Sequence, residues 1–119
     1  MIENTLAERG NNYGNFHTLS NLSQTLDQII QRHYASAHST KEVPNPQMPH
    51  FMAEAIHMIC HKLARIANGN PMHIDSWHDI GGYSELVVSI LRGAEAHQKA
   101  MEVEAANTEE AEQETSDEE

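Results

Sequence analysis

Apolar residues recur at intervals of three and four wherever the sequence shows a regular pattern, and this spacing marks one face of an α-helix. No segment alternates apolar and polar residues as a half-buried strand does. We therefore predict an all-α fold, a small antiparallel helical bundle of three to four helices within residues 1–101. Because a domain of this size buries only a modest core, we expect oligomerisation to complete it as a homo-oligomer.

Three helices are predicted, at about residues 15–37, 50–67 and 75–100. The connector 38–49 holds three prolines, which disfavour helix in the residues before them and allow the chain to reverse. Each helix has one apolar face that we expect to be buried. These faces comprise Phe16, Leu19, Leu22, Leu26, Ile29, Ile30 and His33; then Met52, Ile56, Ile59, Leu63 and Ile66; then Trp77, Ile80, Tyr83, Val87, Ile90, Leu91 and Ala94.

Helix ends also have signals in the sequence. Gly69 is suited to the left-handed position that ends the second helix. Ser76 followed by Asp79 has the spacing of a capping box, which would begin the third helix. Leu86, together with the apolar residues 87–91, is the predicted seam between subunits.

The acidic residues are unevenly distributed. Residues 102–119 carry nine acids and no base, and we expect them to form a disordered acidic tail. Residues 1–101 hold seven bases against nine acids, a net charge of −2. Such a body has no basic surface to bind a phosphate backbone, so duplex nucleic acid is not an expected partner. The tail could be a DNA mimic, a docking peptide or a solubility device.

A single cysteine, Cys60, cannot form an internal disulfide and lies in an apolar helical pattern, so we expect a buried thiol and a reducing compartment. No apolar run is long enough to span a bilayer, and the first residues lack the pattern of a signal peptide. We therefore expect a soluble protein of the cytoplasm with no membrane partner.

Most residues capable of chemistry lie between Glu54 and Leu86. On a helical projection Glu54 falls on the same face as His61 and Arg65, opposite the apolar face, while Lys62 flanks the core. On the third helix four residues form a narrow line beside the core face: Asp75, Asp79, Gly82 and Leu86.

One interpretation of these groups is a magnesium site. Glu54, Asp75 and Asp79 would bind Mg²⁺, which prefers oxygen ligands, and Lys62 and Arg65 would bind phosphates. The structural alternative is that Asp79 caps a helix, Asp75 favours the helix dipole and Glu54 is solvated.

Two further interpretations involve other metals or nucleophiles. His57 and His61 have the i, i+4 spacing of two zinc ligands, and His78 or Asp79 could supply a third ligand. The HExxH pattern of zinc proteases is absent. Nucleophilic catalysis has little support, because Cys60 belongs to the apolar pattern.

Gly81 and Gly82 stand inside the third predicted helix, where each costs about 1 kcal/mol relative to alanine. A close-packed neighbouring helix, a kink, or a ligand lying against bare backbone would each account for them. Tyr83 follows them and could direct its hydroxyl toward a ligand.

The strings ERGNNYGNF and EAIHMICHKLARIANGNPMHIDSWHDIGGYSEL resemble a family of small helical proteins of bacteriophages and prophages. The family pattern covers residues 8 to about 90. It is matched at Glu8, Arg9, Gly10, Tyr13, Gly14, Phe16, Lys62, Arg65, Asn68, Gly69, Asp75, Ser76, Trp77, Asp79, Gly82 and Tyr83.

That family is similar in turn to the nucleotide-modification-associated helical domains of phages and, more distantly, to all-α nucleoside triphosphate pyrophosphatases of the MazG and dUTPase kind. This resemblance implies an oligomeric helical protein that acts on nucleotides with Mg²⁺ held by acids on adjacent helices. The pyrophosphatase pattern is EExxE followed by ExxD. This chain has only Glu54 on the second helix and Asp75 with Asp79 on the third, so it has fewer carboxylates.

We therefore expect a pocket that binds a nucleotide or a nucleotide-derived signal molecule. Its phosphate ligands would be Lys62, Arg65 and Arg9, with Tyr83 or Tyr13 against base or sugar. Arg9 could instead form a salt bridge at the start of a helix. The alternatives are a Mg²⁺-dependent pyrophosphatase and a protein inhibitor of a host defence factor, and a phage-encoded chain would act in the host cytoplasm.

Overall fold

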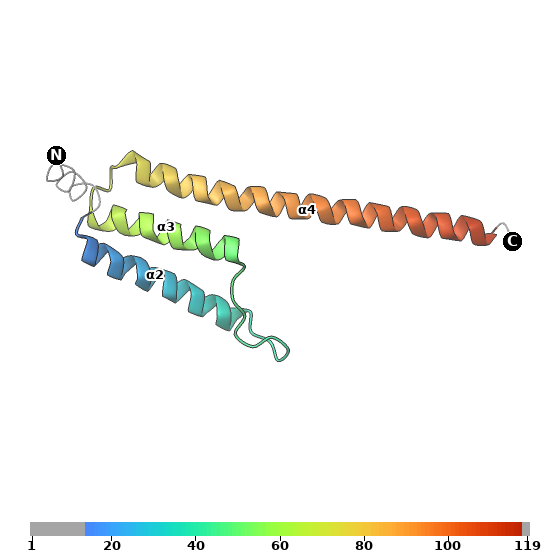
Figure 1. Ribbon diagram of the computed structural model, residues 1–119, viewed down its shortest axis with the longest axis horizontal. Helices are drawn as coiled ribbons and strands as arrows, with labels where there is room; N and C mark the ends of the chain where they lie inside the picture. Colours follow the sequence, from blue (N-terminus) through green and yellow to red (C-terminus); the bar gives the residue numbers. More distant parts are fainter. Residues whose placement is uncertain (1–13, 118–119) are drawn as a thin grey trace. The chain divides into compact units, whose positions relative to one another are not determined.

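The computed structural model describes residues 14–117, and the structural statements that follow concern those residues. They form three α-helices: α2 (Phe16–Ala37), α3 (His50–Asn68) and α4 (Ile74–Asp117) (Figure 1). The predicted all-α fold is confirmed. The bounds of α2 and α3 agree with the sequence pattern to within one residue, because capping and proline signals mark their ends clearly.

Local hydrogen bonds fix both ends of α2. Asn15 precedes the helix, and its Oδ1 accepts a hydrogen bond from the Thr18 amide at 3.2 Å. After Ala37 the connector 38–49 turns back through Asn45, whose φ of 47° is left-handed and whose amide donates to Ser39 Oγ at 3.0 Å. The connector thus ends α2 and reverses the chain, as its composition predicts.

α2 and α3 lie side by side and antiparallel (Figure 1), and most of the buried residues of these two helices are small. Leu19 and Ser23 of α2 are buried, as are Ala55, Cys60 and Ala64 of α3. Small residues at a helix contact let the two backbones approach closely. The expected burial of Cys60 is confirmed.

The predicted apolar faces are wrong in detail. Phe16 is 77% exposed and Leu63 is 40% exposed, although both were expected in the core. α3 is covered by α2 on one side and by the first turns of α4 on another. The buried residues of α3 are therefore distributed over more than one face of the helix, and do not form a single apolar line.

The turn after α3 differs from the expected left-handed cap. Gly69 has φ −114° and ψ −134°, so it is extended, and its amide donates to Arg65 O at 2.8 Å. The left-handed residue is Gly14, with φ +79°, and it packs against the end of α3. A Cβ added to Gly14 would lie 2.5 Å from Asn68 O, so no larger residue fits there.

α4 begins at Ile74, ahead of the predicted capping box. The Asn70 Oδ1 accepts from the Met72 amide at 3.0 Å, and Trp77 Nε1 donates to Pro71 O at 2.8 Å. These contacts shape the corner before the helix. Ser76 consequently lies within the first turn and is buried, so the prediction that it caps the helix was wrong.

α4 continues to Asp117, whereas the sequence pattern predicted its end near Ala100 and disorder after it. Residues 101–117 are rich in alanine and glutamate and contain no glycine or proline, so their intrinsic propensity favours helix. The residues on each side of the Val87–Val88 boundary contact mainly one another, so the chain divides there into two compact units. We call the described residues up to Val87 the first unit and those from Val88 the second unit. No helix within residues 14–117 has the length and apolar character needed to span a membrane.

Candidate functional site

The central pair of the candidate site joins α3 to α4. Lys62 Nζ lies 2.9 Å from Asp79 Oδ2, and the Lys62 side chain is only 10% exposed, while that of Asp79 is 42% exposed. The lysine stem lies along the core and its ammonium reaches the edge, as the sequence predicts. The ion pair thus lies where the protein interior meets solvent.

Several cations act on this pair. The Lys62 hydrogen bond is the main cause of the lowered pKa of Asp79. Burial opposes this shift, and the charges of Lys62, His78 and Arg65 lower the pKa further. Burial lowers the pKa of His61, and the charges of Arg65, Lys62 and His57 add to that effect. Lys62 and Arg65 thus contribute two positive charges near the carboxyl end of α3, and Asp79 pairs with the first of them.

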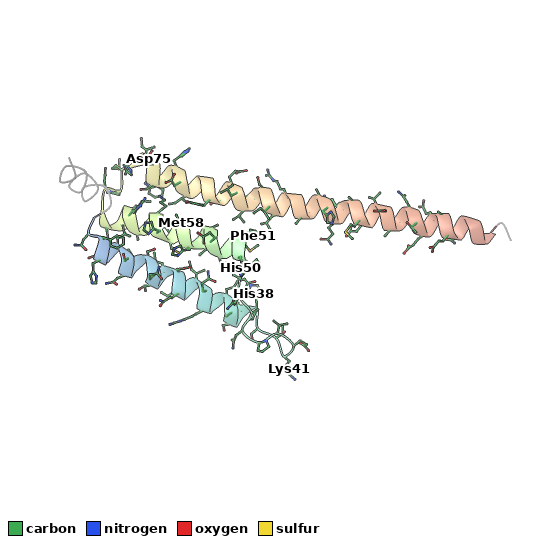
Figure 2. All side chains as sticks on the ribbon, in the orientation of Figure 1. His38, Lys41, His50, Phe51, Met58 and Asp75 are labelled. Atoms are coloured by element: carbon green, nitrogen blue, oxygen red, sulfur yellow. The ribbon has the colours of Figure 1, made fainter. Side chains whose placement is uncertain are left out.

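The structure brings only some of the predicted site residues together. Asp75 lies in the first turn of α4 (Figure 2), and its side chain is 83% exposed with His73 Nε2 at 4.0 Å. Glu54 is exposed and precedes Lys62 by eight residues, which is about 12 Å along the helix. Tyr83 is half-buried on α4. The remaining predicted residues, Arg9 and Tyr13, lie outside the described part of the chain.

The carboxylates do not form the expected cluster. Within residues 14–117, no group of three or more histidine, cysteine, aspartate or glutamate side chains is placed to hold a metal ion. Glu54, Asp75 and Asp79 therefore do not come together, and Asp79 is already neutralised by Lys62. This donor set does not fit a magnesium ion held by three acids.

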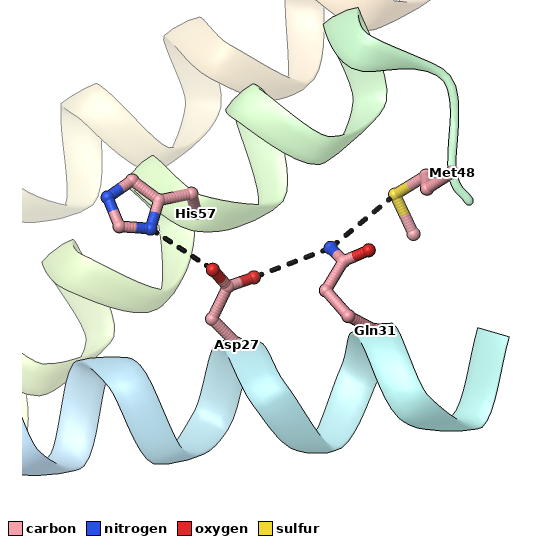
Figure 3. Close-up of polar contacts among 4 residues, drawn as sticks. All are labelled: Asp27, Gln31, Met48 and His57. Carbon is pink, nitrogen blue, oxygen red and sulfur yellow. Dashed lines mark hydrogen bonds and ion pairs between the residues drawn. The ribbon is translucent and has the colours of Figure 1, made fainter. Parts of the chain in front are cut away.

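A second polar cluster lies between α2 and α3, and the sequence analysis did not predict it (Figure 3). His57 Nδ1 lies 3.1 Å from Asp27 Oδ2, and Gln31 Nε2 donates to Asp27 Oδ1 at 3.4 Å and to Met48 Sδ at 3.8 Å. His57 is thus engaged with α2, and not paired with His61 around a metal. An acid between the apolar positions of α2 was the signal that could have revealed this contact.

Gly81 and Gly82 are surrounded by open space. A Cβ added to either would meet no atom of the described chain within 4 Å, so close packing of a helix from this chain does not explain them. Both are exposed on α4, and Gly82 lies one turn after Asp79. Bare backbone is therefore accessible beside the ion pair.

An apolar groove lies on another part of the first unit. It has a volume of about 330 Å³ and is open at the surface. Residues of α3, the connector before it and α4 line it: Met48, Met52, Ala55, Ile56, Ile59, Ser84 and Val87. Neither Lys62 nor Asp79 lines this groove, so the charged site and the apolar groove are separate features.

Comparisons of this chain with models of protein families, with curated proteins and with solved structures found no match.

Proposed function

We propose that the chain binds a nucleotide or a nucleotide-derived signal molecule, and sequesters it, with phosphate held at Lys62 and Arg65. The observation that carries this proposal is the Lys62 ammonium, which is almost buried at the α3–α4 corner and paired with a half-exposed carboxylate. The resemblance to nucleotide-associated helical proteins of phages supports the same ligand class.

The chemistry of the pair suits a phosphate. An ammonium has three N–H donors, so Lys62 can retain Asp79 and also donate to a phosphate oxygen. Arg65 follows three residues later on α3 and adds a second permanent positive charge to the same region. Asp79 and Asp75 would accept hydrogen bonds from ribose hydroxyls, and Tyr83 would contact base or sugar.

The exposed positions of Gly81 and Gly82 support the proposal that a ligand binds against this face of α4. Gly82 is one turn from Asp79, and nothing from the described chain occupies the space beside it. The binding free energy of a ligand lying against this backbone would offset the cost of glycine in a helix, which is about 1 kcal/mol for each residue relative to alanine. A methyl group at Gly82, as alanine would supply, would obstruct that ligand.

Calorimetric titration of the full chain with nucleoside triphosphates and cyclic dinucleotides, with and without Mg²⁺, tests the proposal. We expect Lys62→Met to weaken binding by about tenfold or more, the loss expected when a charge-assisted hydrogen bond is removed. Lys99→Met is the matched control, because Lys99 is exposed on the second unit and pairs only loosely with Glu95 at 3.9 Å. Equal binding by both variants would contradict the proposal.

A glycine pair gives a second, independent test. Gly82→Ala is expected to raise the melting temperature and to weaken ligand binding. Gly93→Ala is the matched control, since Gly93 is also on α4 with open space around it but far along the chain from Lys62. It should raise helix stability without affecting the ligand.

Sequestration and hydrolysis differ in what happens to the ligand. A binder returns the nucleotide unchanged after the protein is denatured. An all-α pyrophosphatase would release pyrophosphate in the presence of Mg²⁺, and Asp79→Asn would abolish that release. We place the binder first, because the described acids supply no three-carboxylate metal cluster.

A second candidate function is inhibition of a host defence protein by direct contact. Every described side chain from Ser89 to Gln113 is exposed, and this stretch of α4 carries several acids and apolar residues together. Deletion of residues 102–119 separates the two functions. It should abolish inhibition by this route and leave nucleotide binding at Lys62 intact.

A further inference from the structure

Two faces of α3 are left uncovered within the first unit. His57 contacts Asp27 of α2, and Lys62 contacts Asp79 in the first turns of α4. Because His57 and Lys62 are five residues apart, they project about 140° from each other, so the two neighbouring helices flank α3 on nearly opposite sides (Figure 1). The remaining two faces differ in chemistry. One is polar and the other apolar: Glu54, His61 and Arg65 on the first, and Met52, Ile56 and Leu63 on the second.

α2 contributes apolar residues to the same side as Ile56. The pair between Asp27 and His57 marks one edge of the contact between α2 and α3. On α3, the helical projection leads from His57 across the buried Cys60 to Ile56 on the far side. On α2, the same order leads from Asp27 across the buried positions to three apolar residues: Leu22, Leu26 and Ile29. The apolar residues of both helices therefore lie on one side, away from the polar pair.

α4 contributes Trp77. Ser84 lines the apolar groove together with Ile56, and Trp77 precedes Ser84 by seven residues, so both lie on the same side of α4. The Trp77 side chain is 54% exposed, although its Nε1 already donates to Pro71 O at 2.8 Å. The ring can consequently be buried without leaving an unpaired donor. We call the following six residues the first-unit apolar face: Leu22, Leu26, Ile29, Ile56, Leu63 and Trp77.

The first-unit apolar face has the size and charge of a protein interface. Ile29 is 59% exposed and Leu63 is 40% exposed. No lysine, arginine, aspartate or glutamate of α2, α3 or residues 74–87 projects onto it. α3 is about 28 Å long and packed helices lie 8–10 Å apart, so three helices present roughly 700 Å² in projection. A standard interface buries about 800 Å² of accessible surface on each partner, and accessible surface exceeds projected area.

The small core of a single copy indicates which partner covers this face. Among residues 14–117 the buried apolar residues are Leu19, Ala55, Cys60 and Ala64, and three of these are small. Apolar burial is the main favourable term in folding, so a core of this size gives little stability. The face therefore needs to be covered whenever the chain is folded. The partner that is always present with the chain is another copy of it.

We propose that a second copy of this chain covers the first-unit apolar face, so that two first units pack face to face about a two-fold axis. The face then contacts itself, and each contact occurs twice. The second copy lies across one side of all three helices and does not enter between α3 and α4. Because the face carries no formal charge, two copies of an acidic chain meet there without opposed carboxylates. This pairing does not depend on the proposed function, since Arg65 lies on the other uncovered face of α3.

Sedimentation equilibrium of the full chain measures the pairing. We expect a dimer at micromolar concentrations, and we expect Leu63→Glu and Ile29→Glu each to raise its dissociation constant by about tenfold or more. Leu86→Glu is the matched control. Leu86 is 62% exposed, lies nine residues and therefore 180° from Trp77 on α4, and belongs to the seam that the sequence predicts. Circular dichroism checks that the variants keep their helices, and Ile29, the more exposed of the two positions, preserves the test if Leu63→Glu does not fold. A wild-type monomer at all concentrations, or equal disruption by Leu86→Glu, would overturn the proposal.

Tryptophan fluorescence locates the interface, because Trp77 is the only tryptophan of the chain. We expect its emission maximum to move to shorter wavelength over the concentration range in which the dimer forms, as the half-exposed ring loses contact with water. Leu86→Glu should retain this shift, and Ile29→Glu should displace it to higher concentration. An emission maximum that stays constant while the measured mass doubles would place the interface elsewhere and overturn the proposal.

Discussion

α4 passes through two regions that stabilise the same helix in different ways. In the first unit its side chains contact other helices, as in the ion pair between Asp79 and Lys62. In the second unit the side-chain contacts join residues four apart on α4 itself, such as Lys99 with Glu95 and Gln98 with Glu102. One part of the helix therefore depends on tertiary packing, and the other on intrinsic propensity.

The largest expected effect is at Gly14, which fixes the chain against the end of α3. Gly14→Ala forces a left-handed alanine, costing about 1–2 kcal/mol, and adds a Cβ only 2.5 Å from Asn68 O. We expect a clear fall in the thermal midpoint of the first unit. Gly93→Ala in the second unit, where the surroundings are open, should raise helix content and leave that midpoint unchanged. A Gly14→Ala protein with an unchanged midpoint would show that this contact does not stabilise the fold.

The next effect is at the ion pair that joins α3 and α4. Asp79→Asn leaves the nearly buried Lys62 ammonium without its anionic partner, so we expect it to lower the melting temperature. Glu95→Gln, which breaks an exposed pair of the second unit, should leave the melting temperature unchanged. Salt distinguishes the two pairs as well, since high ionic strength screens the exposed pair more effectively.

The stability of the first unit should depend on pH through His61. Burial, with Arg65, Lys62 and His57, lowers the pKa of His61 from 6.5. As the pH falls below about 6.5, the unfolded chain binds a proton that the folded chain does not, so the free energy of unfolding decreases until the lowered pKa is passed. His61→Gln should flatten this part of the pH profile of urea unfolding.

The helices were predictable because their signals are local. Proline in the connector and Asn15 before α2 act on neighbouring backbone, so the sequence alone places the first two helices to within a residue. The core was less predictable, because burial depends on which helices flank α3. Leu63 matches an apolar periodicity but is exposed, whereas Ala55 and Ala64 are buried where helices approach closely.

The candidate site was predictable only in part. Helical projection placed Lys62 beside the core of its helix and Asp79 beside the core face of α4. In the structure the two residues form an ion pair. The partner of His57 could not be predicted, because Asp27 is thirty residues away and its approach requires α2 to pack antiparallel on α3. The predicted end of α4 is wrong for another reason: an acidic composition indicates disorder, but glutamate and alanine also favour helix, and α4 continues to Asp117.

The smallest expected effect on the first unit comes from a change deep in the second. Ala105→Gly removes about 1 kcal/mol of helix propensity at an exposed position whose helix is described to Asp117. Because propensity alone supports this part of α4, we expect helix content measured by circular dichroism to fall. The melting temperature of the first unit should not change, since no packed contact is lost there. If instead Ala105→Gly lowered that melting temperature as much as Asp79→Asn does, the two regions would unfold as one, and the division after Val87 would not describe their stability.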